Sequence, residues 1–145
     1  MTTEENKALI QRLVDEVWNT GNLAVATELY APDYVNHDPV LPDVRGIQEF
    51  AAWFTQLRTA MPDFHVEIND TVAEGDRVAK RWAARGTHMA DYLGVPPTGE
   101  PVELEGTTTY RIANGKIAEC WWSYDPKQLR PHRAVPSAPE LAATR

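Results

Sequence analysis

The chain has 145 residues, enough for one domain to bury a sizeable core without disulfides or metals. Lysine and arginine number 14 against 21 aspartate and glutamate residues. The resulting net charge of −7 disfavours nucleic acid or an anionic membrane as the main partner, so a compact neutral ligand fits better. The single cysteine, Cys120, cannot form an internal disulfide, and no paired Cys/His spacing suggests a zinc site.

No apolar run is long enough to span a bilayer. The polar start, MTTEENK, also lacks the basic and apolar regions of a secretory signal. We therefore expect a cytoplasmic protein.

The first third of the chain has the spacing of amphipathic helices. Thr2 and Glu5 have the spacing of a capping box, and apolar residues then recur at helical intervals as far as Trp18. Asn22 can cap a second, shorter helix that continues to Tyr30.

An extended segment is expected over residues 33–37, after Pro32. A third helix follows Gly46 and ends at Pro62, which cannot continue it. The chain therefore begins with three helices.

From Phe64 onward the apolar period changes from helical to two, which predicts strands. The expected strands begin at Phe64 and then cover 77–88, 102–112 and 116–125. Asn114-Gly115 is a strong hairpin signal between the last two. These patterns predict an α+β fold, with the helices on one face of an antiparallel meander.

The residues after Asp125 contain four prolines and few apolar anchors. We interpret 1–125 as one domain and 126–145 as an extended, proline-rich tail.

Several segments together carry a resemblance to a known family. They are Tyr34-Val35-Asn36-His37-Asp38-Pro39, Met61-Pro62-Asp63-Phe64, Gly86-Thr87-His88, Pro97-Thr98-Gly99 and Gly115 to Trp121 with Asp125. In this order the chain resembles the SnoaL-like polyketide cyclases, or ester cyclase group, of the nuclear-transport-factor-2-like superfamily. The resemblance implies a cone-shaped α+β barrel around one pocket for a small organic molecule.

The resemblance also implies a chemistry that uses neither metal nor cofactor. In the family's cyclases, an aspartate near the end of the last strand acts as acid and base in an intramolecular aldol closure, and by position Asp125 resembles it. The sequence departs from the common pattern at Cys120, where a histidine often precedes the tryptophan, and at Ala90, where a glycine is usual.

Asp125 is the first candidate catalytic residue. It shares its strand parity with Trp121, and a carboxylate beside aromatic rings is desolvated, which raises its pKa and makes it a better base. The alternative is an aspartate that caps a turn ahead of Pro126.

His88 is the second candidate catalytic residue. It shares a strand face with Trp82 and could polarise a substrate carbonyl or shuttle a proton with Asp125. A histidine hydrogen-bonded to the loop backbone is the alternative. Asn36 and His37 are candidate substrate-binding residues, although an Asx turn before Pro39 explains Asn36 equally well.

Four more side chains, three of them aromatic and suited to hold a planar apolar ligand, are candidates for lining the pocket, although most large apolar residues belong to the plain core. They are Trp82, Tyr110, Glu119 and Trp121. Arg77, Arg81 and Arg85 share the opposite strand face, and we expect either a homodimer surface there or a simple solvated face.

The leading hypothesis is an enzyme without cofactor that performs acid/base chemistry on a small apolar carbonyl compound. One alternative is hydrolysis or dehydration through a water held by an Asp/His pair. The other is a domain that binds a small ligand and catalyses nothing.

Overall fold

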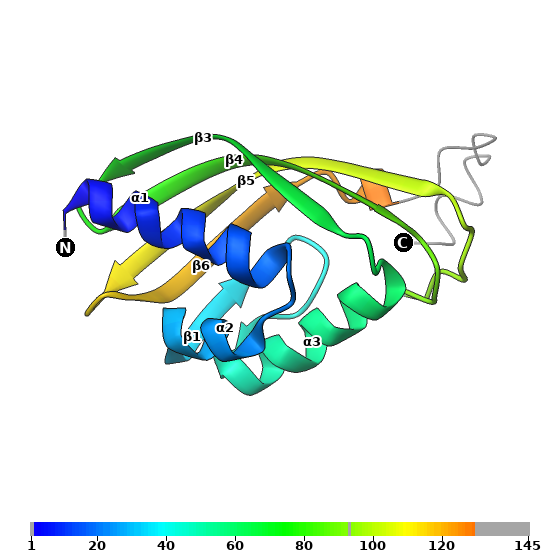
Figure 1. Cartoon of the computed structure of the whole chain (residues 1–145), viewed down its shortest axis with the longest axis horizontal. Coiled ribbons are helices and arrows are strands. Elements are labelled where there is room, and N and C mark those ends of the chain that lie inside the picture. Colours follow the sequence, from blue (N-terminus) through cyan, green and yellow to red (C-terminus); the bar gives the residue numbers. More distant parts are fainter. Residues whose placement is uncertain (1, 93, 130–145) are drawn as a thin grey trace.

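The computed structural model describes residues 2–92 and 94–129, which form a helical layer against one curved sheet (Figure 1). The helical elements are α1 (Thr3–Arg12), a π-helical turn η1 (Leu13–Trp18), α2 (Leu23–Leu29), α3 (Gly46–Ala60) and a short 3-10 helix η2 (Pro126–Leu129). The strands are β1 (Tyr30–His37), β2 (Val44–Arg45), β3 (His65–Glu74), β4 (Arg77–Thr87), β5 (Pro101–Ala113) and β6 (Lys116–Tyr124). The expected α+β class is confirmed.

The predicted helix signals are present. Thr2 Oγ1 accepts the backbone N–H of Glu5 at 3.0 Å, and Glu5 Oε1 accepts the backbone N–H of Thr2 at 2.9 Å. Asn22 caps α2 by accepting the N–H of Val25. The extended segment expected after α2 is longer than predicted, since β1 already begins at Tyr30.

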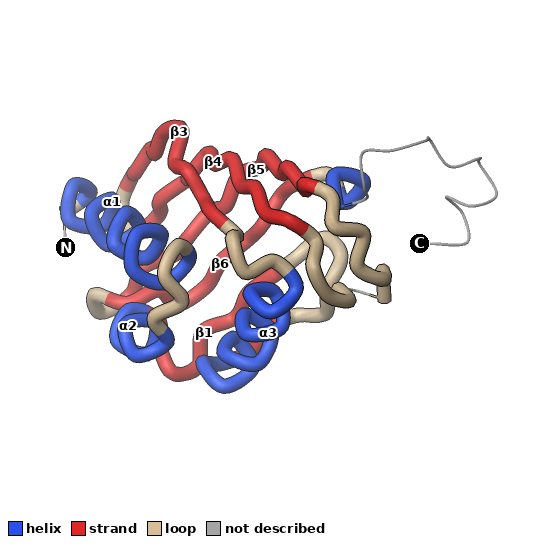
Figure 2. The backbone as a smooth tube through the Cα atoms, turned by 45° about the vertical axis from the view of Figure 1, so that its right-hand side comes forward, coloured by secondary structure: helices blue, strands red, loops and turns tan. Residues whose placement is uncertain are grey.

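The sheet is mixed, which corrects the predicted antiparallel meander. Its strand order is β2-β1-β6-β5-β4-β3, and β1 pairs with β6 in parallel. The strands β3 to β6 form an antiparallel meander as predicted, with Asn114 and Gly115 both at positive φ in the β5–β6 turn. Figure 2 shows this sheet bending over the helices.

A β-bulge in β6 decides which of its side chains face inward. Arg111 pairs with Glu119, but the next residue, Ile112, pairs with Ile117, so Ala118 is the extra residue. Ile117 and Cys120 are both buried on the inner face despite their different parity. From Cys120 onward the even-numbered residues of β6 face inward.

Trp18 joins the helical layer to the sheet. Its ring contacts those of Phe54 and Trp122 at centroid distances of 5.2 and 5.3 Å, and it is 2% exposed. In the part of the chain that the structure describes, no helix has both the length and the apolar character needed to cross a membrane. Of the predicted tail, 126–129 form the 3-10 turn, and 130–145 lie outside the described residues.

Candidate functional site

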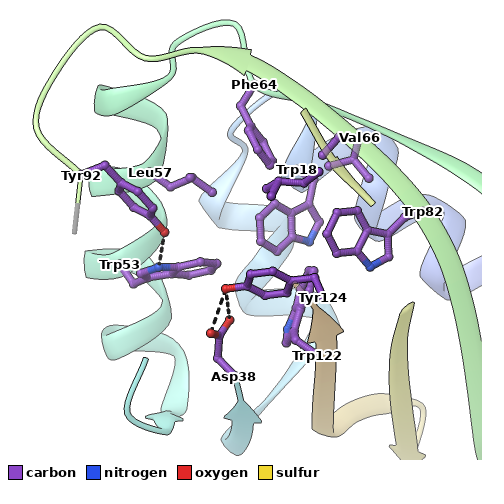
Figure 3. A pocket seen from close by; sticks show the side chains of 12 residues that line it. Trp18, Asp38, Trp53, Leu57, Phe64, Val66, Trp82, Tyr92, Trp122 and Tyr124 are labelled. Atoms are coloured by element: carbon purple, nitrogen blue, oxygen red, sulfur yellow. Dashed lines mark hydrogen bonds between the residues drawn. The ribbon is translucent and has the colours of Figure 1, made fainter. Parts of the chain in front are cut away.

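A pocket lies between the helical layer and the inner face of the sheet (Figure 3). Its volume is about 480 Å³, a figure that includes the part open to solvent. Aromatic and aliphatic side chains form most of its wall. The lining residues are Trp18, Asp38, Trp53, Leu57, Phe64, Val66, Trp82, Ala84, Tyr92, Leu104, Trp122 and Tyr124.

Of the described residues that line the pocket, Asp38 is the only one with a carboxylate. Its Oδ1 accepts the backbone N–H groups of Val40 and Leu41, at 2.8 and 3.2 Å, and the hydroxyl of Tyr124 at 2.9 Å. Within the described residues, its Oδ2 accepts only the Tyr124 hydroxyl, at 3.2 Å. Oδ2 is therefore the oxygen with acceptor capacity left for a ligand.

Tyr124 supplies the hydroxyl that meets Asp38. Burial is the main cause that raises the pKa of Tyr124, and the charge of Asp38 adds to it. The phenol therefore stays protonated at neutral pH and acts as a donor to the carboxylate.

Trp53 of α3 and Tyr92 of the loop after β4 form a second polar contact in the pocket (Figure 3). The indole Nε1 of Trp53 donates to the Tyr92 hydroxyl at 3.2 Å. Burial raises the pKa of Tyr92 to about 12, so its own proton remains available to a ligand.

Two indoles of the wall are held from behind by buried polar side chains. Trp82 Nε1 donates to Thr108 Oγ1 at 2.9 Å, and Trp122 Nε1 donates to Asn36 Oδ1. Asn36 is 5% exposed and does not line the pocket, so it positions Trp122. Trp82 does line the pocket, as the sequence suggested.

The expectation that Asp125 is desolvated beside aromatic rings is wrong. Its side chain is exposed, it is not among the lining residues, and its Oδ1 accepts the backbone N–H of Lys127 at 3.0 Å. It follows the inward-facing Tyr124 and therefore points away from the pocket. Its observed contact is the turn-capping interaction that the sequence left open.

His88 is 3% exposed and does not line the pocket. Its backbone N–H donates to Glu100 O, and its carbonyl accepts the N–H of Gly99. Within the described residues neither ring nitrogen has a hydrogen-bond partner. The structure therefore does not bring His88 and Asp125 together around one ligand.

Three predicted binding residues, His37, Glu119 and Trp121, form a cluster on the outer face of the sheet instead. His37 Nε2 lies 2.7 Å from Glu119 Oε2, its Nδ1 lies 3.0 Å from Asp43 Oδ1, and its ring stacks on Trp121. Glu119 is the main cause that raises the pKa of His37, and His37 in turn lowers the pKa of Glu119. The bulge at Ala118 explains the error for Glu119 and Trp121, because it reverses the strand parity after it, and His37 is paired with Trp121.

Tyr110, the remaining predicted lining residue, is fully buried in the core and is absent from the pocket wall. Sequence reasoning missed Asp38, Trp53, Tyr92 and Tyr124. For Tyr124 a signal was available, since Trp122 and Tyr124 alternate with the polar residues Ser123 and Asp125. For Trp53 and Tyr92 no local signal distinguishes a pocket wall from ordinary core.

The donor set offers no obvious metal centre. Among residues 2–92 and 94–129, no three His, Cys, Asp or Glu side chains are grouped so that they could hold a metal ion. The site instead combines one carboxylate, two phenols and a wall of indoles.

Comparison with known proteins gives consistent results. The family model for the SnoaL-like polyketide cyclases matches residues 8–131. The aklanonic acid methyl ester cyclase DnrD of Streptomyces peucetius is 32% identical over 114 residues, which are 77% of this chain and 78% of that protein. DauD of Streptomyces sp. strain C5, named for the same activity, is also 32% identical over 114 residues, 77% of this chain and 70% of its own.

Solved structures agree in fold. A protein from Jannaschia sp. CCS1 assigned to the SnoaL-like polyketide cyclases superposes with a TM-score of 0.79 at 27% identity, over 85% of this chain and 87% of its own. AclR of Streptomyces galilaeus, proposed to be a hydroxylase, gives a TM-score of 0.77 at 29% identity, over 88% and 94% of the two chains. Relatives of this fold are thus assigned to more than one reaction.

Proposed function

The chain belongs to the SnoaL-like polyketide cyclase family, and we propose that it catalyses an intramolecular aldol-type cyclisation, or a related proton transfer, on an apolar carbonyl compound. The proposed reaction uses acid/base chemistry without a cofactor. The proposed proton acceptor is Asp38.

The observation that carries this proposal is the setting of Asp38. It is the single carboxylate in a wall made mostly of aromatic rings, and its Oδ1 already accepts three donors. These donors fix the orientation of the carboxylate and leave Oδ2 for the substrate.

In the proposed mechanism, Asp38 Oδ2 takes a proton from the carbon between two carbonyl groups of the substrate. The resulting enolate carbon attacks a ketone of the same molecule, a C–C bond forms, and the ketone oxygen becomes an alkoxide. Protonated Asp38 returns its proton to that alkoxide. The hydrogen bond from Tyr124 holds the carboxyl group in place throughout.

The indoles contribute orientation. Trp82 and Trp122 each use their only N–H group behind the wall, so they offer ring surface to the ligand. A substrate already held in a folded conformation between such surfaces loses less conformational entropy when the ring closes. This entropy loss is a large part of the activation free energy of intramolecular reactions.

The structure gives less support to a water held by an Asp/His pair. Among the lining residues of the described pocket there is no histidine. A domain that only binds a ligand has the same pocket and is separated from an enzyme by experiment.

The test compares Asp38→Asn with Asp125→Asn, the same chemical change in a carboxylate outside the pocket. Aklanonic acid methyl ester, the compound named for the two curated relatives, is the first substrate to assay. We expect Asp38→Asn to lower kcat at least about 100-fold while ligand affinity persists, and Asp125→Asn to stay near wild type.

Loss of turnover in Asp125→Asn with normal turnover in Asp38→Asn would return the catalytic role to Asp125. Tight binding of the ligand by the wild-type protein with no turnover would instead identify a binding domain.

A further inference from the structure

Lys80 lies in the interior of the domain, two residues before the pocket residue Trp82 along β4. It occupies the inner face of β4 between Val78 and Trp82, opposite Thr108 of β5, and its exposed fraction is 0%. A lysine is rarely buried in this way without an acidic partner. In the described part of the chain Lys80 has no ion pair, and its Nζ donates no hydrogen bond.

Aromatic and weakly acidic groups surround the amine. Lys80 Nζ lies 5.3 Å from the ring centroid of Tyr110 and 5.3 Å from that of Trp122. The thiol of Cys120 interacts electrostatically with Lys80, Tyr110 and Tyr34. The hydroxyls of Tyr34 and Tyr110 are buried, and within the described residues neither has a hydrogen-bond partner.

These surroundings favour the neutral amine. Burial lowers the pKa of Lys80 to about 7. A much larger fraction of the Lys80 amine is then neutral at pH 7 than the roughly one in 3,000 of a lysine of ordinary pKa. A neutral, desolvated amine is the form of lysine that attacks carbonyl carbon.

We propose that Lys80 is a covalent site for small carbonyl compounds, at which its amine condenses with a ketone or aldehyde to form an imine. The geometry behind the proposal is a buried amine without a hydrogen-bond partner among the described residues, 5.3 Å from the ring centroids of Tyr110 and of Trp122, a residue of the pocket wall. No role for Asp38 is assumed.

The condensation needs no oxidant or reductant. The lone pair of Nζ forms a bond to the carbonyl carbon, and the carbonyl oxygen takes up a proton as the amine nitrogen loses one, giving a carbinolamine. The C–O bond then breaks, the oxygen leaves as water with a second proton, and a C=N bond remains. Tyr110, whose ring centroid lies 5.3 Å from Nζ, carries a hydroxyl that is a candidate for these proton transfers.

Access to Lys80 leads past Trp122. This residue lines the pocket and its ring is in contact range of Nζ, while its indole N–H is bonded to Asn36. A carbonyl compound in the pocket reaches the amine when the Trp122 ring turns aside. The rate of condensation should therefore depend on the size of residue 122.

The probe for the test is 2,4-pentanedione, whose condensation with an amine releases one water and gives a conjugated enaminone that absorbs in the near ultraviolet. The folded wild-type protein is incubated with the diketone at pH 7, and the modified lysine is located by peptide mass spectrometry. We expect Lys80 to be modified at least about tenfold faster than Lys7, Lys116 or Lys127, which serve as internal controls.

Two variants and a pH series sharpen the test. Lys80→Met replaces the amine with an apolar side chain of similar length and should abolish the fast absorbance change. Trp122→Ala should make that absorbance change faster. In wild type the rate should rise with pH around 7 and then level off, while the control lysines keep accelerating toward pH 10.

Modification of Lys80 no faster than the control lysines in both wild type and Trp122→Ala would overturn the proposal. An unchanged fast phase in Lys80→Met would do the same. None of these measurements uses enzymatic turnover, so their outcome is separate from that of the Asp38 experiment.

Discussion

The hydroxyl of Tyr124 donates to both carboxylate oxygens of Asp38, at 2.9 and 3.2 Å, and so links the end of β6 to the residue that follows β1. Tyr124→Phe removes this donor and keeps the ring. We expect kcat to fall about tenfold to hundredfold, less than in Asp38→Asn, because the N–H groups of Val40 and Leu41 still orient the carboxylate. Steady-state kinetics of the two variants side by side gives the comparison, and a Tyr124→Phe enzyme as impaired as Asp38→Asn would assign the tyrosine a direct chemical role.

The strands and helices could be predicted from the sequence because local signals specify them. The capping box at Thr2, the proline after α3 and the Asn114-Gly115 turn all act within a few residues of the boundary they mark. The parallel pairing of β1 with β6 joins segments about 85 residues apart, and no short-range pattern reports it.

The candidate site was harder to predict because it depends on a single extra residue. In an uninterrupted strand, Glu119 and Trp121 would face inward together with Ile117. The bulge at Ala118 instead turns them outward and turns Trp122 and Tyr124 inward. A bulge at an alanine leaves no trace in an apolar/polar pattern. Asp38 also could not be identified as a pocket residue without the fold, because the β1–β6 pairing is what places it beside Tyr124.

Gly106 of β5 lets the side chains of two pocket residues from the neighbouring strands pack closely over the β5 backbone. A Cβ at this position would lie 2.5 Å from the carbonyl oxygen of Ser123, 2.8 Å from Trp82 Cζ2 and 3.0 Å from Tyr124 Cβ. Gly106→Ala should therefore lower the free energy of unfolding by about 1–3 kcal/mol and weaken ligand binding as well.

The matched control is Gly86→Ala in the neighbouring strand. Its new Cβ would lie 3.1 Å from Met61 Cβ and 3.2 Å from Met61 Sδ, with no contact below 3.0 Å, so a smaller loss of stability is expected. Urea denaturation of both variants measures the difference. Equal losses in the free energy of unfolding would show that the close packing of Gly106 against Trp82 and Tyr124 contributes no more to stability than the contact of Gly86 with Met61.

His37 provides a pH-dependent contact on the outer face of the sheet. Its pKa is raised chiefly by Glu119 and less by Asp43, so Glu119→Gln should lower the pKa of His37 further than Asp43→Asn does. The stabilisation is fully present below the unfolded-state pKa of about 6.5 and is lost as pH rises through the higher folded-state value.

Because His37 is about one-third exposed (33%), the contact is worth less than about 1 kcal/mol. Histidine titrations followed by NMR in the three proteins test the order of these effects. A larger drop in Asp43→Asn than in Glu119→Gln would contradict the assignment.

Lys80 has the opposite effect on stability. Its folded-state pKa of about 7 lies below the usual value of 10.5. Between pH 7 and pH 10.5 the amine is therefore protonated in the unfolded chain and neutral in the folded protein. The cost of burying the amine is therefore full below pH 7, falls by about 1.4 kcal/mol per pH unit between 7 and 10.5, and is absent above that range. Lys80→Met should raise the free energy of unfolding at pH 7 by about 2–4 kcal/mol, with a gain that shrinks toward pH 10. Urea denaturation at pH 7 and pH 9 measures this, and a gain that stays constant between the two would mean that Lys80 remains charged in the folded protein.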